Sequence, residues 1–383
     1  LILLIGLSNF SVSIASDEII KIQPETPIEF PDSAAPYRDH EDDLLDFYYG
    51  SFGKGRTPHA TQAVRESGPL IAPKAIWKSA IPILSGIHDF HTEYKKTFLP
   101  VIEREYPELL AAYKSSDDLL SKKGKALKYL HEKILDESGK NWFFSILTAN
   151  MHRSKVPDLA NLYFDLSHPI YDVLFDNADI ADFSDGERIA RLTKIVTRNY
   201  DIPNPNPMEK LLIIIVQGLV KNIPSQNVEP FFFYLLKLHE AQTDSIRQHN
   251  ANISDEELRR TTFRKGGYSM VLYALLADHN FSQDELDGYF LEGAMLQNLD
   301  DFSDLEEDRG EGINTLAFRK LITPEEVWSM KDVVQRHFEQ FIEKGTYDEK
   351  MVDTYFGALD MFILGNTKLY DRAIDKVTNE NLK

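Results

Sequence analysis

The stretch that decides how this chain is interpreted is 296-LQNLDDFSDLEEDRGEG-312. It places six acidic residues within nine positions, and a single arginine, Arg309, follows them. A run of this kind is usually a solvated surface, and that alternative stays open. The spacing of Asp300, Asp304 and Asp308 argues for more, because on a helix a step of four residues turns by about 400° and rises by about 6 Å. The three carboxylates would therefore form a row on one face.

This row would lie at the end of a helix. Ser282 followed by Glu285 is a capping-box pattern, so we expect a helix from Ser282 to about Asp308, with Gln297 extending the same row. The helix dipole is negative at this end, and each acid there costs about 0.3–1 kcal/mol before mutual repulsion. A divalent cation would remove that penalty. Carboxylates suit hard cations, above all Mg²⁺ beside a phosphate, with Mn²⁺ as the alternative, whereas no register fits the loop of an EF-hand.

A second acidic pair lies upstream, in 168-HPIYDVLFDNAD-179. Asp172 and Asp176 are one helical turn apart in an otherwise apolar stretch. Burial of an unpaired carboxylate is unfavourable, so we expect a cation or a basic group to neutralise them. A partly exposed pair near a helix end is the other interpretation.

The remaining pattern indicates an all-α protein. From about residue 76, apolar residues recur at helical spacing between short breaks such as 201-DIPNPNP-207 and 222-NIPSQNVEP-230. Thr323, Pro324 and Glu326 mark another helix start, and the alternation typical of strands is nearly absent. We predict one large helical bundle over 76–383, with about ten to twelve helices.

The N-terminal segments differ from this bundle. Residues 1–16 form an apolar run with Ser13 and Ala15 placed as in a signal-peptidase site, which predicts an export signal and an exported or periplasmic protein. A buried N-terminal segment in a cytoplasmic or membrane-associated protein is the alternative. Residues 17–75 are rich in Pro and Gly, so we expect an extended arm. A literal D-D-x-x-D sequence, 42-DDLLD-46, falls in this arm and is interpreted as a surface run.

The composition argues against several kinds of partner, metal site and catalytic group. A net charge of −19 argues against nucleic acid as a partner, because such proteins need Lys and Arg against phosphates. The absence of Cys excludes disulfides, thiolate metal sites and cysteine nucleophiles. The histidines that could serve as metal ligands or bases are His88, His91, His168 and His239, and no pair of them has the spacing of a zincin site. Contact with a membrane surface and the oligomeric state stay open.

On its acidic motifs the chain resembles the class I isoprenoid synthase superfamily, above all the squalene and phytoene synthase branch. There, two facing helices each carry an aspartate-rich motif, and together they hold Mg²⁺ ions on a substrate diphosphate. Asp172 and Asp176 are similar to the first motif in its D-x-x-x-D form, with Tyr171 where a D-D-x-x-D motif has an adjacent aspartate. The second motif, Q-x-x-N/D-x-x-x-D-x-x-x-D, resembles Gln297, Asp300, Asp304 and Asp308.

A closer likeness is to the bacterial tetraprenyl-β-curcumene synthase-like group. The acidic run ending in E-E-D-R and the segment 264-RKGGYSMVL-272 are both similar to that group, and the resemblance covers roughly residues 80–375. It implies a terpene or prenyl synthase, a lyase or transferase that ionises a long isoprenoid diphosphate with Mg²⁺ before cyclisation or condensation.

Two basic residues are candidates for binding the diphosphate. Arg264 and Lys265 begin the Gly-Gly segment and could neutralise the leaving group, although ordinary surface cations are an equal alternative. Aromatic side chains near the first motif could line an apolar pocket, although they are as readily plain core. The rival hypothesis is an exported helical protein of the same fold that binds lipid diphosphate or metal without synthase activity.

Overall fold

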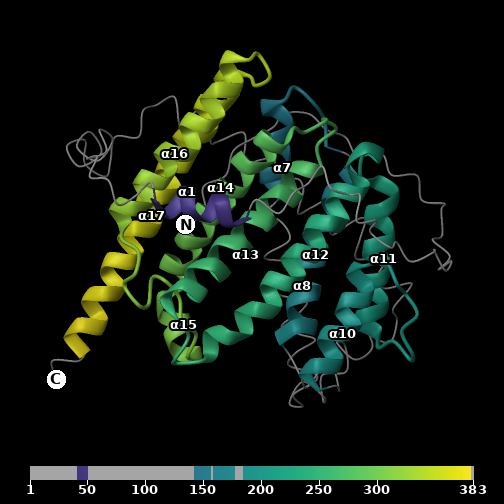
Figure 1. Ribbon diagram of the computed structural model, residues 1–383, viewed down its shortest axis with the longest axis horizontal. Helices are drawn as coiled ribbons and strands as arrows, with labels where there is room; N and C mark the ends of the chain where they lie inside the picture. Colours follow the sequence, from purple (N-terminus) through teal and green to yellow (C-terminus); the bar gives the residue numbers. More distant parts are fainter. Residues whose placement is uncertain (1–40, 51–141, 157, 177–183, 381–383) are drawn as a thin grey trace, which may run out of the picture.

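The computed structural model describes residues 41–50, 142–156, 158–176 and 184–380. Within these residues the regular structure is entirely helical, which confirms the predicted all-α class. The α-helices are α1 (Glu41–Gly50), α7 (Trp142–Met151), α8 (Asp158–Asp176), α10 (Asp185–Val196), α11 (Pro207–Asn222), α12 (Val228–Ser245), α13 (Asp255–Leu275), α14 (Gln283–Ser303), α15 (Leu305–Glu311), α16 (Pro324–Glu343) and α17 (Glu349–Glu380) (Figure 1).

Local signals in the sequence set where several helices begin. At α14 the Ser282 side chain accepts from the Glu285 N–H, and the Glu285 carboxylate accepts from the Ser282 N–H, so the predicted capping box is confirmed. Thr323 and Glu326 form the same reciprocal pair at α16, again as predicted. These bonds satisfy donors that a helix start leaves free.

The antiparallel helices α13 and α14 form the centre of the described fold. They cross where Gly266 of one faces Gly293 of the other, so closely that a methyl group on either glycine would overlap the other's carbonyl oxygen. Gly267 gives similar room to the Phe290 ring. The Gly-Gly segment is thus explained by close helix packing, since glycine alone lets two backbones approach this far.

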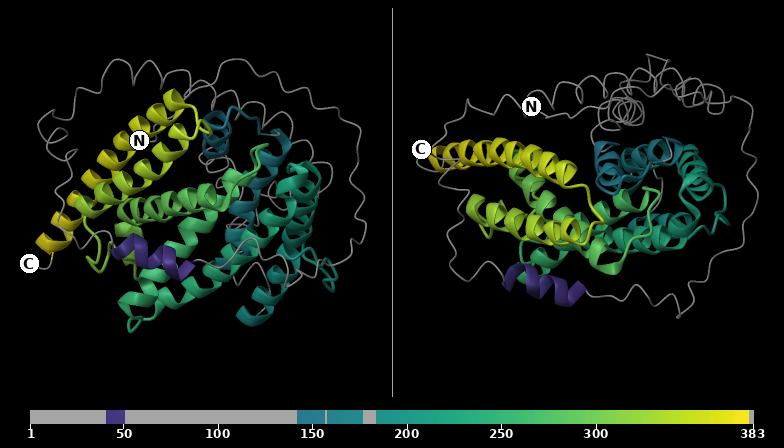
Figure 2. Two further views of the ribbon diagram at one scale, coloured as in Figure 1. Left: turned by 45° about the horizontal axis from the view of Figure 1, so that its top comes forward. Right: turned by 90° about the horizontal axis from the view of Figure 1, so that it is seen from above.

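Other helices cover this central pair on two sides. Helix α12 packs along α13, and α16 and α17 pack on α14. Figure 2 shows α1 on one side of the pair and α7 with α17 on the other, in agreement with their contacts. Helices α8, α10 and α11 form the part beyond α12 and α7. None of the described helices combines the length and apolarity needed to cross a membrane.

Ten residues of the expected N-terminal arm are helical, so the prediction of an extended arm is wrong for 41–50. Leu45 and Tyr48, three residues apart, are buried, and Tyr48 packs on the Phe263 ring of α13. An ion pair of 3.0 Å joins Glu41 to Arg264. The segment therefore has an apolar face and a charged anchor, which together hold it on the core. Asp42 of the D-D-L-L-D run is exposed and pairs with Arg260. The rest of 1–75 lies outside the described residues, including the signal-like segment.

Candidate functional site

The acidic row at the end of α14 is interrupted in the structure. Helix α14 ends at Ser303, and Asp304 leaves helical geometry with φ −98° and ψ 7° before α15 begins. We predicted one continuous helix to about Asp308, so this break is a correction. Hydrogen bonds from Asp304 N to Asp300 O (3.0 Å) and from Asp308 N to Asp304 O (2.9 Å) nevertheless continue the helical pattern. Asp300 and Asp304 are exposed, and Asp308 is partly buried.

The buried acid of this region is Asp301. Its exposed fraction is 7%, one carboxyl oxygen accepts from Gln297 Nε2 at 3.2 Å, and the other has no hydrogen-bond partner among the described residues. Burial, with the charges of Asp300 and Asp308, raises the pKa of Asp301 to about 8, against the lowering effects of Gln297 and Lys265. Gln297 thus contacts both Asp300 and Asp301, and Asp308 and Lys265 lie near enough for their charges to act on Asp301.

Sequence reasoning missed Asp301. The sequence contains a pattern that includes it, because 300-DDFSD-304 is a D-D-x-x-D sequence, like 42-DDLLD-46 in the arm. Burial distinguishes Asp301 from the other acids of this run, and spacing along the sequence does not show which of them is buried.

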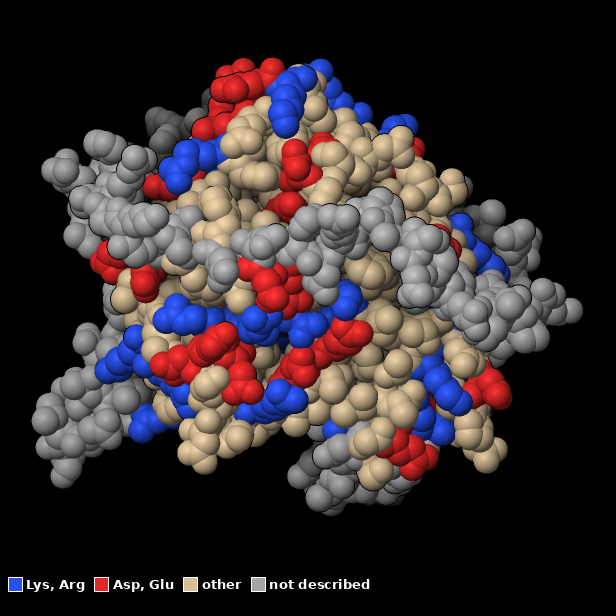
Figure 3. Space-filling model, in the orientation of Figure 1, with Lys and Arg blue, Asp and Glu red and all other residues tan. Residues whose placement is uncertain are grey.

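The two basic candidates have different surroundings. Lys265 lies close enough to Asp301 for its charge to lower the pKa of that carboxyl. Arg264 instead pairs with three carboxylates, Asp244 at 2.8 Å, Glu41 at 3.0 Å and Glu240 at 3.7 Å. Its charge is therefore already balanced within the protein. Figure 3 shows acidic and basic side chains interleaved on the face that carries α1, rather than one acidic surface.

The first predicted motif lies on a different part of the fold. Asp172 is half-buried on α8, where its charge raises the pKa of His168 against the larger lowering effect of burial. Asp176 is the last residue of α8. This helix packs on α11, α10 and α7, and it meets α13 through Tyr273, whose ring lies 5.7 Å from that of His168.

Tyr273 is nine residues from Arg264, or about 180° around α13. Helix α8 therefore approaches α13 from the side opposite to Arg264. Among the described residues the main contacts of α8 are with α11, α10 and α7 rather than with α14, so the two acidic motifs do not lie on directly packed helices.

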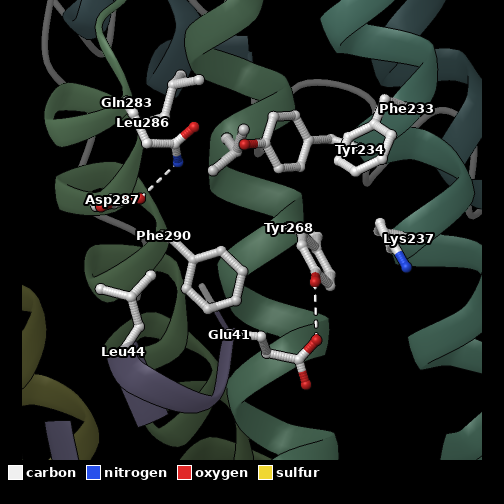
Figure 4. A pocket seen from close by; sticks show the side chains of 11 residues that line it. Glu41, Leu44, Phe233, Tyr234, Lys237, Tyr268, Gln283, Leu286, Asp287 and Phe290 are labelled. Carbon is white, nitrogen blue, oxygen red and sulfur yellow. Dashed lines mark hydrogen bonds between the residues drawn. The ribbon is translucent and has the colours of Figure 1, made fainter. Parts of the chain in front are cut away.

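An aromatic pocket lies along the N-terminal half of α14, where Gln283, Leu286, Asp287 and Phe290 contribute to its wall (Figure 4). It is formed where α1, α12, α13 and α14 meet, and its walls include the rings of Phe233, Tyr268 and Phe290. The Tyr268 hydroxyl donates to Glu41 at 2.9 Å across one end. Phe290 and Gln297 are seven residues apart, which is about 20° from full alignment on a helix. The pocket and Gln297 therefore share one side of α14.

The histidines considered from sequence have structural roles where they are described. His239 contacts the Tyr171 hydroxyl at 2.6 Å and the Thr193 hydroxyl at 2.8 Å, and burial lowers its pKa to about 4. His168 Nδ1 donates to the Phe164 carbonyl oxygen at 3.0 Å, and its Nε2 lies 3.5 Å from the Tyr273 hydroxyl of α13. His88 and His91 lie outside the described residues.

Comparison of the chain with protein families, curated proteins and solved structures finds no match.

Proposed function

We propose that this protein binds the diphosphate of a long isoprenoid through Mg²⁺ at the acidic end of α14 and ionises it, as a class I terpene or prenyl synthase does. The observation that carries this proposal is the burial of the Asp301 carboxyl. A carboxyl that is buried beside two further acids, with one oxygen unpartnered among the described residues, is unfavourable in its charged form without a cation.

The donor atoms suit the metal. Carboxylate oxygens of Asp300, Asp301 and Asp308 and the amide oxygen of Gln297 form the hard set that Mg²⁺ prefers, and Mn²⁺ would accept the same set. Bound Mg²⁺ would neutralise charge that develops on the leaving diphosphate. Asp304, exposed at the break between α14 and α15, could add a further oxygen.

The chain itself would supply three functions around the diphosphate. Asp301, whose pKa is about 8 without a cation, would release its proton when the site fills. Lys265 would contribute a fixed positive charge close to the leaving group. Phe290 is eleven residues from Asp301, or about 16 Å along α14, so the aromatic pocket could contact part of a long apolar tail, away from the ionising carbon.

A second candidate function is binding of a lipid diphosphate without turnover. Two observations favour it: Arg264 is already paired with three carboxylates, and Asp172 lies on a helix that approaches the far side of α13. The exported location expected from residues 1–16 would suit this candidate, since isoprenoid diphosphates are mostly made in the cytoplasm.

One experiment separates the two functions. The full chain is incubated with prenyl diphosphates of increasing length and Mg²⁺, and both released diphosphate and organic-soluble products are measured, together with binding of the unreacted substrate. Products with released diphosphate support the synthase, and saturable Mg²⁺-dependent binding without release supports the binding protein. Absence of both rejects the proposal. Asp301→Asn should abolish the Mg²⁺-dependent signal, whereas Glu306→Gln, on the exposed side of α15, should retain it.

A further inference from the structure

Three metal-ligating side chains converge at the opposite end of α14. His152 directly follows α7, His279 lies in the loop between α13 and α14, and Glu285 is in the first turn of α14. One ligand atom from each lies within 4.8 Å of the other two. His279 Nε2 is 3.3 Å from Glu285 Oε1, and His152 Nδ1 is 3.8 Å from the same oxygen.

The surrounding structure fixes the orientation of these groups. Glu285 Oε2 accepts from the backbone N–H of Ser282 at 2.8 Å and from its hydroxyl at 2.7 Å, which leaves Oε1 directed at the histidines. His152 Nε2 contacts the Tyr289 hydroxyl at 3.1 Å. The two imidazole rings stack with centroids 3.9 Å apart, and the Phe281 ring stands edge-on to both. The contact of His152 Nε2 with Tyr289 is of the kind that fixes the orientation of a metal-binding histidine.

One atom of the cluster is left without a hydrogen bond among the described residues. The His152 side chain is 0% exposed, and its Nδ1 has no such partner. If Nε2 donates to Tyr289, Nδ1 carries a lone pair that faces the Glu285 carboxylate. If Nδ1 carries the proton instead, the 3.8 Å distance to Oε1 is too long for a hydrogen bond. Either tautomer leaves a buried polar atom unsatisfied, which is unfavourable.

The protonation states of His152 and Glu285 also favour a bound cation. Burial and the neighbouring His279 lower the pKa of His152 to about 3, against the raising effect of Glu285, so the ring is neutral near pH 7. Burial opposes ionisation of Glu285, but hydrogen bonds from His279 and Ser282 hold its pKa at about 2. A neutral imidazole and an ionised carboxylate thus present electron pairs toward one point, as ligands do toward a cation.

We propose that His152, His279 and Glu285 bind a Zn²⁺ ion through Nδ1, Nε2 and Oε1. The proton that His279 Nε2 donates to Glu285 without the metal would be on His279 Nδ1 when zinc is bound. Ligand atoms that lie about 2.0–2.2 Å from a tetrahedral zinc are about 3.3–3.6 Å apart. The 3.3 Å separation of His279 Nε2 from Glu285 Oε1 is in this range, whereas His152 Nδ1, at 3.8 Å from the same oxygen, would have to move slightly inward. Two imidazoles with one carboxylate suit Zn²⁺ much better than Mg²⁺. The His279 side chain is 23% exposed, so the fourth position would face water. The ion would join α7, the α13–α14 loop and α14.

This site is separate from the acidic end of α14. Glu285 and Asp301 are sixteen residues apart on one helix, or about 24 Å along its axis. Zinc binding therefore neither requires nor excludes the proposed diphosphate site.

The test uses the full chain without a polyhistidine tag. The metal-free protein is titrated with Zn²⁺ against a chromophoric chelator, and Co²⁺ is added separately to record its visible absorption. We expect one Zn²⁺ per chain, tetrahedral Co²⁺ bands, and no competition from millimolar Mg²⁺. His279→Gln and Glu285→Gln should each weaken Zn²⁺ binding by more than about 100-fold, because loss of an outer-shell partner alone costs about 10–100-fold.

Two controls separate loss of zinc binding from loss of folding and from a general effect of histidine replacement. Gln at 285 can still cap α14, and His279 is a partly exposed loop residue, so both variants should fold, as circular dichroism will show. His249→Gln changes an exposed histidine outside the cluster and should leave Zn²⁺ affinity unchanged. Failure of the wild type to bind Zn²⁺, or equal affinity in the wild type and His279→Gln, would show that the cluster is only a buried histidine pair.

Discussion

Replacing the buried acid Asp301 by Asn should stabilise the protein in the absence of divalent cations. In the folded state the Asp301 pKa is about 8, against an ordinary value of 3.8, and the group is 7% exposed. Between these two pH values the folded state holds a proton that the unfolded chain releases, so stability falls as pH rises. Near pH 7 about three pH units at about 1.4 kcal/mol each amount to roughly 4 kcal/mol. Asn has no such proton, and the loss should vanish.

The assay is urea unfolding of both proteins in chelator, from about pH 4 to pH 9. The free energies of unfolding should agree near pH 4, diverge steadily to about 4 kcal/mol in favour of Asp301→Asn near pH 7, and level off above pH 8. Asp304→Asn alters an exposed neighbour and should follow the wild type within about 0.5 kcal/mol at every pH. A difference between Asp301→Asn and wild type that does not change with pH would refute the reasoning, since the carboxyl would then ionise normally in the fold.

Three further outcomes are expected. Mg²⁺ with diphosphate at about 100 times its Kd should raise wild-type stability by about 2.7 kcal/mol in thermal melts, Asp301→Asn should lose most of this gain, and Glu306→Gln should keep it; equal gains in all three would indicate a solvated surface. Gly266→Ala should destabilise by about 3 kcal/mol or more in urea unfolding, because its methyl group would overlap α14 backbone, whereas Gly186→Ala, with open space around it, should stabilise by about 0.5 kcal/mol. Tyr48→Ala should destabilise by about 3 kcal/mol, and an unchanged melt would mean that α1 is not held on the core.

Much of the helical architecture follows from local sequence. The capping boxes at Ser282 and Thr323 involve residues three positions apart, so their hydrogen bonds can form within a single turn. Apolar periodicity likewise acts over one or two turns, which is why the all-α class could be predicted without knowledge of the packing. The Gly-Gly segment was noticed from sequence, but its reason, contact with Gly293, lies on another helix.

The acidic site could be predicted from the sequence only in part. Sequence spacing identified the region from Gln297 to Asp308, because helical geometry relates position to direction. It could not show that Asp301 is the buried acid, that the helix breaks at Asp304, or that Arg264 is already paired, because each depends on neighbours from other helices. The same limit applies to the first motif, whose place beside α11 is a matter of packing.

The sequence by itself therefore determined the all-α class, the starting points of α14 and α16 and the end of α14 where carboxylates gather, since all of these arise from interactions between residues close along the chain. Only the tertiary structure decided that residues 41–50 dock on the core and that His152 meets His279 and Glu285. Those contacts join segments far apart in sequence, and their partners are selected by burial and shape, which no local pattern records.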